Sequence, residues 1–325
     1  MPKNIQRRQL LKATGAALLA VPGFASAQSW PVKPIRLLVP FPPGGLIDTM
    51  ARLMSARLAQ ELGQPVVIDN KPGAGGNLGA AEIARSTPDG YALLMASPPL
   101  TISPALYTSM PYKPEQIAPV GLMGRVPNVL IVNPKSGINN LAELLAKAKS
   151  RPGQLNYASN GNGTSLHLSA ELLKSSTGTF ITHIPYRGAA QAVTGLIAGE
   201  VDMMFENLPS VIGQIQAGSV KALAVTTRQR SKAIANVPTL IESGVPDFDV
   251  SAWYGLAVPA GVPAAVLARL EQALEKVTRD ADIMRAMESR GADVGFLNAQ
   301  QMGAFMTTDA AKWKRVASFA KITLG

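Results

Sequence analysis

Residues 41–45 read Phe-Pro-Pro-Gly-Gly, a composition that suits the binding of a small anion. They follow an apolar run at 35–39 that predicts a strand, and they precede apolar residues at the three- and four-residue spacing typical of a helix. Because Gly44 and Gly45 have no Cβ, a ligand can approach their backbone closely. The N–H groups at the start of the helix would point at that ligand, and a carboxylate is a small anion that suits them. The alternative interpretation is a turn that binds nothing.

A second loop, at 161–165, has the same design in the later half of the chain. It follows a short predicted strand at 156–159 and leads into a predicted helix. Thr164 and Ser165 can cap that helix, or they can bind an oxygen with side chain and amide together. Two such loops, one in each half, predict a cleft in which they face each other.

A third glycine-rich segment, at 70–79, leads from a short predicted strand at 65–68 into another helical pattern. It is not a nucleotide-binding P-loop, because Gly-Lys-Ser/Thr is absent and Lys71 precedes the glycines. Its glycines again place backbone amides at the start of a helix, and a flexible connection is the alternative interpretation.

The sequence offers little for catalysis or metal binding. His167 and His183 are the only histidines, and neither has a partner at a metal-ligand spacing such as His-Glu-x-x-His. No Gly-x-Ser-x-Gly motif is present, and Ser165 does not face His167 from two positions away on a helix. We therefore expect no catalytic residue, no metal and no cofactor. An exported hydrolase that uses Ser165 or Asp48 is the alternative.

Two carboxylates leave their roles open. Asp48 lies in the first turn of the first predicted helix, where it can face a ligand or satisfy the start of its own helix. Glu206, at the end of the predicted strand 201–205, can pair with Arg187 or receive a cationic group of a ligand. A solvated surface position is equally compatible with the sequence around Glu206.

Composition bounds the class of protein. The 325 residues are 47% hydrophobic and 16% charged, which is enough for a sizeable core in two ordinary domains. No run of eighteen apolar residues is present, so no transmembrane helix is expected. The absence of cysteine excludes disulfides, thiol catalysis and cysteine-bound metal.

Residues 1–27 have the pattern of a cleaved export signal, which predicts a periplasmic protein. Basic residues precede the short apolar stretch 10–21, and Ala25-Ser26-Ala27 resembles a cleavage site. Arg7-Arg8 resembles a twin-arginine signal. An amphipathic first helix of the mature fold is the alternative.

The chain after this signal keeps 27 basic residues against 21 acidic ones, a net charge of +6. This mild excess favours small anionic ligands through the field of the whole protein. It does not favour nucleic acid, because no window is dominated by Lys and Arg and aromatic residues make up only 5% of the chain.

Strands that alternate with helices predict parallel sheets covered by helices, with ligands bound beyond the carboxyl ends of the strands. Two apolar runs, at 120–132 and 251–258, are predicted to cross between two such units. We therefore expect an export signal at 1–27, a first lobe of 28–127 plus 250–325, and a second lobe of 128–249.

Seven motifs occur in an order and spacing that are specific only when taken together. They are F-P-P-G-G-L-I-D at 41–48, N-K-P-G-A-G-G-N at 70–77, G-N-G-T-S-L-H at 161–167, P-Y-R-G-A-A at 185–190, V-D-M-M-F-E-N at 201–207, V-P-T-L-I-E-S-G at 237–244 and W-Y-G-L-A-V-P-A-G at 253–261. On these motifs the mature chain resembles the Bug family, the extracytoplasmic solute-binding receptors of tripartite tricarboxylate transporters. Ser103 and Lys113 depart from residues common in that family, and both lie outside the two loops.

The resemblance implies an α/β, two-lobed fold of the type II periplasmic-binding-protein kind. It has mixed, mostly parallel sheets flanked by helices, and two crossover strands act as the hinge. It implies a monomer that captures a small carboxylate without catalysis. The partner would be a tripartite transporter complex in the membrane or a sensor. Which acid is bound stays open.

In the family, the first-strand loop and the Gly-Thr-Ser loop grip one carboxylate through backbone amides and bridging waters. This resemblance, together with the strand ends, gives the predicted ligand-binding residues: Phe41, Gly44, Gly45, Asp48, Ser97, Ser159, Asn162, Gly163, Thr164, Ser165, Tyr186, Arg187 and Glu206.

Overall fold

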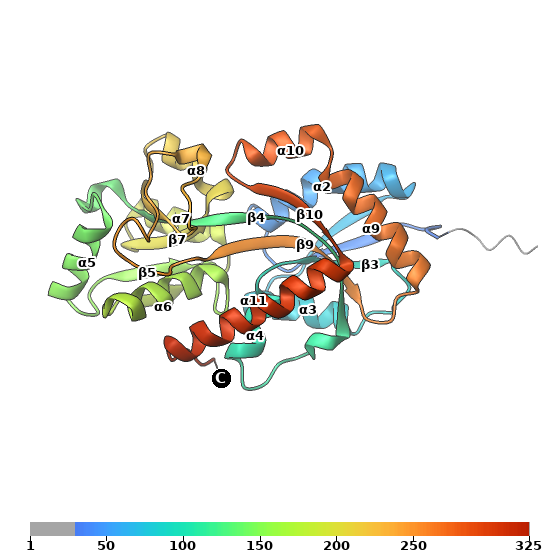
Figure 1. Cartoon of the computed structure of the whole chain (residues 1–325), viewed down its shortest axis with the longest axis horizontal. Helices are drawn as coiled ribbons and strands as arrows, with labels where there is room; N and C mark the ends of the chain where they lie inside the picture. The colour runs from blue at the N-terminus through green and yellow to red at the C-terminus, as the bar shows by residue number, and fades with distance from the viewer. Residues whose placement is uncertain (1–29, 325) are drawn as a thin grey trace, which may run out of the picture.

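A computed structural model describes residues 30–324, which form two α/β lobes side by side (Figure 1). The predicted export signal at 1–27, with its twin-arginine pattern, lies outside the described residues. Within the described part, no helix has the length and apolar character needed to cross a membrane.

Lobe 1 is built on a sheet with the strand order β2-β1-β3-β9-β4, to which β10 adds by pairing with β4. β1 pairs in parallel with β2 and β3, whereas β9, β4 and β10 run antiparallel to their neighbours. The strands are β1 (Ile35–Val39), β2 (Val66–Asn70), β3 (Ala92–Ala96), β4 (Ile117–Val132), β9 (Ser251–Pro259) and β10 (Asp293–Asn298). The helices are α2 (Leu46–Leu62), α3 (Asn77–Ala84), α4 (Pro99–Leu106), α9 (Ala264–Thr278), α10 (Ala281–Glu288) and α11 (Ala299–Phe319).

Lobe 2 repeats this plan, with β5 in parallel with β6 and β7, and with β7 and β8 antiparallel to the far end of β4. Its strands are β5 (Asn156–Ser159), β6 (Thr182–Pro185), β7 (Met203–Asn207) and β8 (Lys221–Val225). Its helices are α5 (Leu141–Ser150), α6 (Ser165–Thr177), α7 (Ala189–Ala198) and α8 (Leu208–Gln216).

β4 and β9 connect the lobes, as Figure 1 shows. β4 pairs with β9 over residues 117–127 and with β7 and β8 over residues 128–132, so that one strand belongs to both sheets. The alternation of strands and helices and the crossing by two long apolar runs are as the sequence predicted. The exact lobe boundaries stay a prediction.

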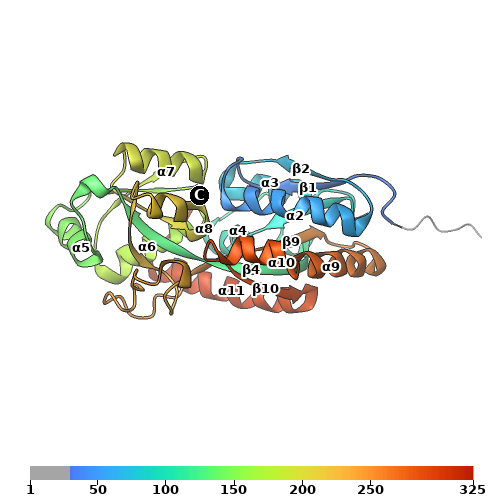
Figure 2. The ribbon, with the colours of Figure 1, turned by 90° about the horizontal axis from the view of Figure 1, so that it is seen from above.

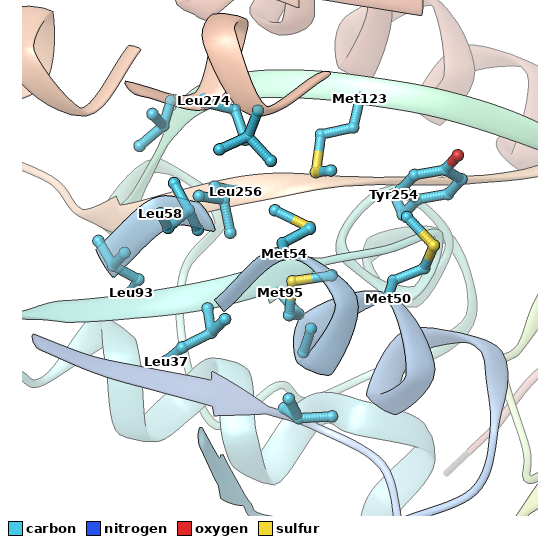
Figure 3. Close-up of a cluster of buried hydrophobic side chains, with 14 of the residues drawn as sticks. Leu37, Met50, Met54, Leu58, Leu93, Met95, Met123, Tyr254, Leu256 and Leu274 are labelled. Carbon is cyan, nitrogen blue, oxygen red and sulfur yellow. The ribbon is translucent and has the colours of Figure 1, made fainter. Parts of the chain in front are cut away.

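The first predicted helix shows how the sequence sets local structure. The apolar residues of α2 recur on one face, and Met50, Met54 and Leu58 are buried there against β1, β3 and β9 (Figure 3). The helix ends at Gly63, whose positive φ of 73° lets its N–H close the last turn onto Ala59. At the other end, Gly45 is the N-cap of α2, so the helix starts directly behind the first loop.

The last helix contacts both lobes. Met302, near the start of α11, packs in a cluster with the lobe 1 strands, whereas Trp313 and Ala317, near its end, pack in the core of lobe 2. α11 is therefore a third segment, besides β4 and β9, that packs in both lobes.

Candidate functional site

A cleft between the lobes holds a chamber of about 640 Å³. Figure 2 shows α7 on the lobe 2 side, and α2 and α3 on the lobe 1 side, of the line where the lobes meet. The chamber is lined from lobe 1 by Phe41, Pro42, Pro72, Gly73, Ala74, Gly75, Gly76 and Tyr107, and from lobe 2 by Asn160, Gly161, Asn162, Tyr186, Arg187 and Gln191. Both lobes thus line one shared space, as expected of a ligand cleft.

Two small cavities, of about 30 and 20 Å³, lie deeper between the lobes. Phe41 and Asn160 line both of them and the chamber, so the three spaces adjoin. Leu46 and Ile47, in the first turn of α2, line both, and Ser165, the first residue of α6, lines the larger. Two helix N-termini, one from each lobe, therefore meet here, and both favour negative charge.

The first loop is held in shape by Asp48. The Gly44 N–H donates to Asp48 Oδ2 at 3.0 Å, while Arg52 and Asn70 donate to the same carboxylate at 2.9–3.0 Å and 3.0 Å. Burial alone would raise the pKa of Asp48, but these hydrogen bonds outweigh it and hold the pKa below its usual value. This geometry fits the second of the two roles open from the sequence, that of satisfying the start of its helix.

The second loop is capped by its own side chains. The Thr164 hydroxyl accepts from the His167 N–H at 3.3 Å and donates to the Gly161 carbonyl at 2.9 Å. The Gly163 N–H donates to His167 Nδ1 at 3.3 Å. Thr164 is thus the N-cap of α6, and Ser165, 5% exposed, is the hydroxyl next to the deep cavity that takes no part in this cap.

Two stacked histidines lie next to the second loop. The His167 and His183 rings stack at 4.3 Å between centroids, and His183 Nε2 lies 2.7 Å from Ser159 Oγ. Burial lowers the pKa of His167 to about 4 and that of His183 to about 3, so both are neutral at pH 7. Ser159 is fully buried and lines none of the three spaces described above.

Glu206 is buried without a cation. It is 0% exposed, its Oε1 accepts from the Asn207 N–H at 2.8 Å, and its Oε2 has no partner among residues 30–324. Burial raises its pKa to about 7. Arg187 is exposed and lines the chamber, and within the described residues no ion pair joins it to Glu206. The solvated surface position considered for Glu206 is therefore wrong.

The structure brings most of the predicted ligand-binding residues to the cleft. The chamber is lined by Phe41, Asn162, Tyr186 and Arg187, and the deep cavities by Phe41, Gly45, Ser97, Thr164 and Ser165. Gly44 lines a separate cavity of about 160 Å³ on another side of the loop. The residues that line none of these spaces are Asp48, Ser159, Gly163 and Glu206. A direct ligand contact by these four stays a prediction.

Sequence reasoning missed Asn160 and Asn207. Both line the deep cavities, and the amide oxygen of each is buried with no hydrogen-bond partner among the described residues. They can therefore bond a ligand or a bridging water. Asn160 directly follows β5 and Asn207 is the last residue of β7, and this place at a strand end was the available signal.

No metal centre appears in this part of the molecule. Residues 30–324 contain no group of three or more His, Asp or Glu side chains that could hold a metal ion. Ser165 has no hydrogen bond to a histidine or carboxylate there, and the buried Ser159–His183 contact is the serine–histidine pair that the geometry does provide.

Residues 50–322 match the family model described as "Tripartite tricarboxylate transporter family receptor". The chain is 37% identical to Protein BugT of Bordetella pertussis over 312 residues, which is 94% of this chain and 96% of that protein.

Solved structures give the same picture. The R. palustris protein Rpa4515 with adipate has a TM-score of 0.87 and 34% identity, covering 90% of this chain and 99% of that one. MatC from Rhodopseudomonas palustris with bound malate has a TM-score of 0.84 and 31% identity, covering 88% and 99%. These comparisons confirm the predicted two-lobed fold and the predicted resemblance.

Proposed function

The chain belongs to the family of tripartite tricarboxylate transporter receptors, and we propose that it captures a small organic acid between its two lobes. Receptors of this family bind solutes outside the cytoplasm. Relatives with 34% and 31% identity are described with adipate and with malate, which supports a carboxylate as the ligand here.

The observation that carries the proposal is the convergence of two helix N-termini on the deep cavities. The first turn of α2 and the start of α6 approach from opposite lobes, and Ser97 and Ser165 line the same space. The deep cavity is small, about 30 Å³, and it adjoins the chamber, so it suits a small head group better than a whole ligand. We place the acid head group there and the body of the ligand in the chamber.

The charge of the chamber agrees with an anionic ligand. Arg187 is the one charged side chain among the lining residues, and none of them is acidic. The remaining lining side chains are aromatic, amide or small. This lining supports an acid with an apolar or polar neutral body, and it disfavours a ligand with an ammonium group in the chamber.

Catalysis is the rival function, and the geometry does not favour it. A serine nucleophile needs a base within hydrogen-bond reach. Ser165 has none among the described residues, and Asp48 is engaged by Gly44, Arg52 and Asn70. A panel of ester, amide and phosphate substrates separates the two functions, because turnover that is lost in Ser165→Ala would favour the hydrolase.

Family membership supports a proposal for the compartment, the oligomeric state and the partner of the protein. We propose that residues 1–27 are a cleaved export signal and that the mature protein works in the periplasm as a monomer. Its partner would be the membrane complex of a tripartite transporter or a sensor. Fractionation of cells that express the full chain, with N-terminal sequencing of the mature product, tests the signal.

A thermal-shift screen of small acids tests the proposed function. The panel holds aliphatic diacids including adipate and malate, aromatic acids such as benzoate, and the corresponding amides as uncharged controls. A ligand at a hundredfold excess over its Kd stabilises the fold by about 2.7 kcal/mol, which is a measurable rise in Tm. We expect at least one acid to raise the Tm while its amide does not. A panel in which amides act as strongly as acids would contradict carboxylate recognition.

A further inference from the structure

Gly75 marks the place where the two lobes touch backbone to backbone. It lies in the loop of residues 73–76 of lobe 1 with φ of +64°. A Cβ on Gly75 would lie 2.1 Å from the carbonyl oxygen of Asn162 in lobe 2. Across the same contact, a Cβ on Gly161 would lie 3.6 Å from the Cα of Gly75. No side chain separates the two loops at this point.

Other glycines between the lobes have softer surroundings. A Cβ on Gly188 would meet Pro42 Cγ at 3.0 Å, and one on Gly45 would meet Ala189 Cβ at 3.8 Å. A Cβ on Gly291 would lie 2.6 Å from Leu208 Cδ2, but the leucine side chain can move away by changing its rotamer. At Gly75 the nearest atom is a main-chain carbonyl oxygen, which cannot change rotamer. A side chain at this position would therefore push one lobe away from the other.

The contact also lies over the binding site. Gly75 and Asn162 both line the 640 Å³ chamber, one from each lobe. Their approach closes one side of the chamber, and the loop at Pro42 and Gly188 closes another. The contact between Gly75 and Asn162 therefore covers part of a ligand in the chamber.

We propose that Gly75 is the positioning residue that sets how completely the lobes close over the ligand. The absence of a Cβ lets the Asn162 carbonyl approach, and this approach retains the bound acid. The inference rests on the proposed function, because it concerns the retention of an acid. It predicts that Gly75 governs the rate of release, since entry occurs before the contact forms.

The test is Gly75→Ala, with Gly178→Ala as its matched control. Gly178 has φ of +62° and nothing within 4 Å of an added Cβ, so that alanine brings the same backbone strain at both positions but meets the other lobe only at Gly75. Binding of adipate and of malate is followed by stopped-flow tryptophan fluorescence on wild type and both variants. The Tm of each ligand-free protein is measured alongside.

We expect both variants to lower the ligand-free Tm by similar amounts, because both place alanine at positive φ. Gly75→Ala should release the acid about tenfold faster with little change in the association rate, whereas Gly178→Ala should release it like wild type. Equal release rates in the two variants would overturn the role of Gly75. A wild type that binds neither acid would instead overturn the proposed function for these ligands, and the inference with it.

Discussion

Ser97 and Ser165 approach the same deep cavity from opposite lobes, and they are 3% and 5% exposed. Ser97 follows β3, and Ser165 begins α6. Because Thr164 is occupied as the cap of α6, Ser165 is the hydroxyl of its loop best placed to donate to a carboxylate. The affinity for an acid should therefore depend on it more than on its neighbour.

We expect Ser165→Ala to weaken binding of the acid identified by the thermal-shift screen by about 10- to 100-fold. A hydrogen bond to a charged group contributes about 1.5–3 kcal/mol, which corresponds to that range. Ser176→Ala, an exposed position near the other end of α6, is the control and should bind like wild type. Calorimetric titration measures both. Equal affinities for wild type and Ser165→Ala would remove the head group from this cavity.

Glu206 should make stability fall as the pH rises. Its pKa is about 7 in the folded protein and 4.5 in the unfolded chain. Between these pH values the folded state therefore keeps a proton that the unfolded state has lost. Stability from this group is full below about pH 4.5 and declines up to about pH 7, by on the order of 3 kcal/mol. The buried histidines act oppositely, because their lowered pKa values cost stability as the pH falls below 6.5.

Comparing wild type with Glu206→Gln isolates this effect, because the histidines contribute equally to both. The variant should gain stability relative to wild type as the pH is raised from 5 to 8, measured by urea unfolding at each pH. A difference between the two proteins that stays constant over this range would mean that Glu206 is already ionised in the folded state at pH 5.

Residue types and local spacing predicted much of the site but not all of it. The glycine loops, the helix starts and the Thr164-Ser165 pair are local features, and the structure places them at the cleft. The role of Asp48 depends on Asn70, which is 22 positions away and is brought near by the pairing of β1 with β2. Such long-range partners are not encoded in spacing along the chain.

At the scale of elements, α11 carries a buried carboxylate that joins several parts of the fold. Asp309 Oδ2 accepts from Thr101 on α4 at 2.7 Å, from Trp253 on β9 at 3.0 Å and from Trp313 at 3.0 Å. Trp253 lies on a strand that connects the lobes, and Trp313 lies in the core of lobe 2. Asp309 therefore ties the last helix to both the connection and the second lobe.

Asp309→Ala should lower the free energy of unfolding by about 3–5 kcal/mol, because it leaves the buried N–H groups of Trp253 and Trp313 without their acceptor, while Thr101 keeps the Pro98 carbonyl. Asp282→Ala is the control, since Asp282 is 87% exposed and pairs only with Arg285, and it should cost less than about 1 kcal/mol. Urea unfolding with the same probe compares them. Equal costs would mean that the donors around Asp309 find water or other acceptors.

The elements themselves were largely predictable, because amphipathic spacing marks α2 and apolar runs mark β4 and β9. The packing of α11 was not. The division that places residues 250–325 in lobe 1 stays a prediction, and Trp313 and Ala317, near the end of α11, pack in the core cluster of lobe 2. Apolar residues along one face of a helix indicate that this face is buried. The same spacing does not indicate which hydrophobic core covers each end of the helix.

At the scale of the whole molecule, capture of an acid between the lobes requires the lobes to move. Contacts between the lobes border the chamber at Gly75 and at Pro42, and closing over an acid means that such contacts form after it enters. The connecting strands β4 and β9 are where such hinge bending is expected, near residues 125–130 and 245–253. Because α11 packs in clusters of both lobes, such a movement has to accommodate this helix as well.

The central claim, that an acid is held between two closing lobes, is tested most directly by one distance. The chain has no cysteine, so Lys71→Cys beside the chamber in lobe 1 and Thr194→Cys on α7 in lobe 2 give a doubly labelled protein without background. Pulsed electron paramagnetic resonance measures the distance between the two spin labels. With a saturating acid from the screen, we expect a single distance that is shorter and more narrowly distributed than without it. The same distance distribution with and without saturating acid would contradict closure around the ligand.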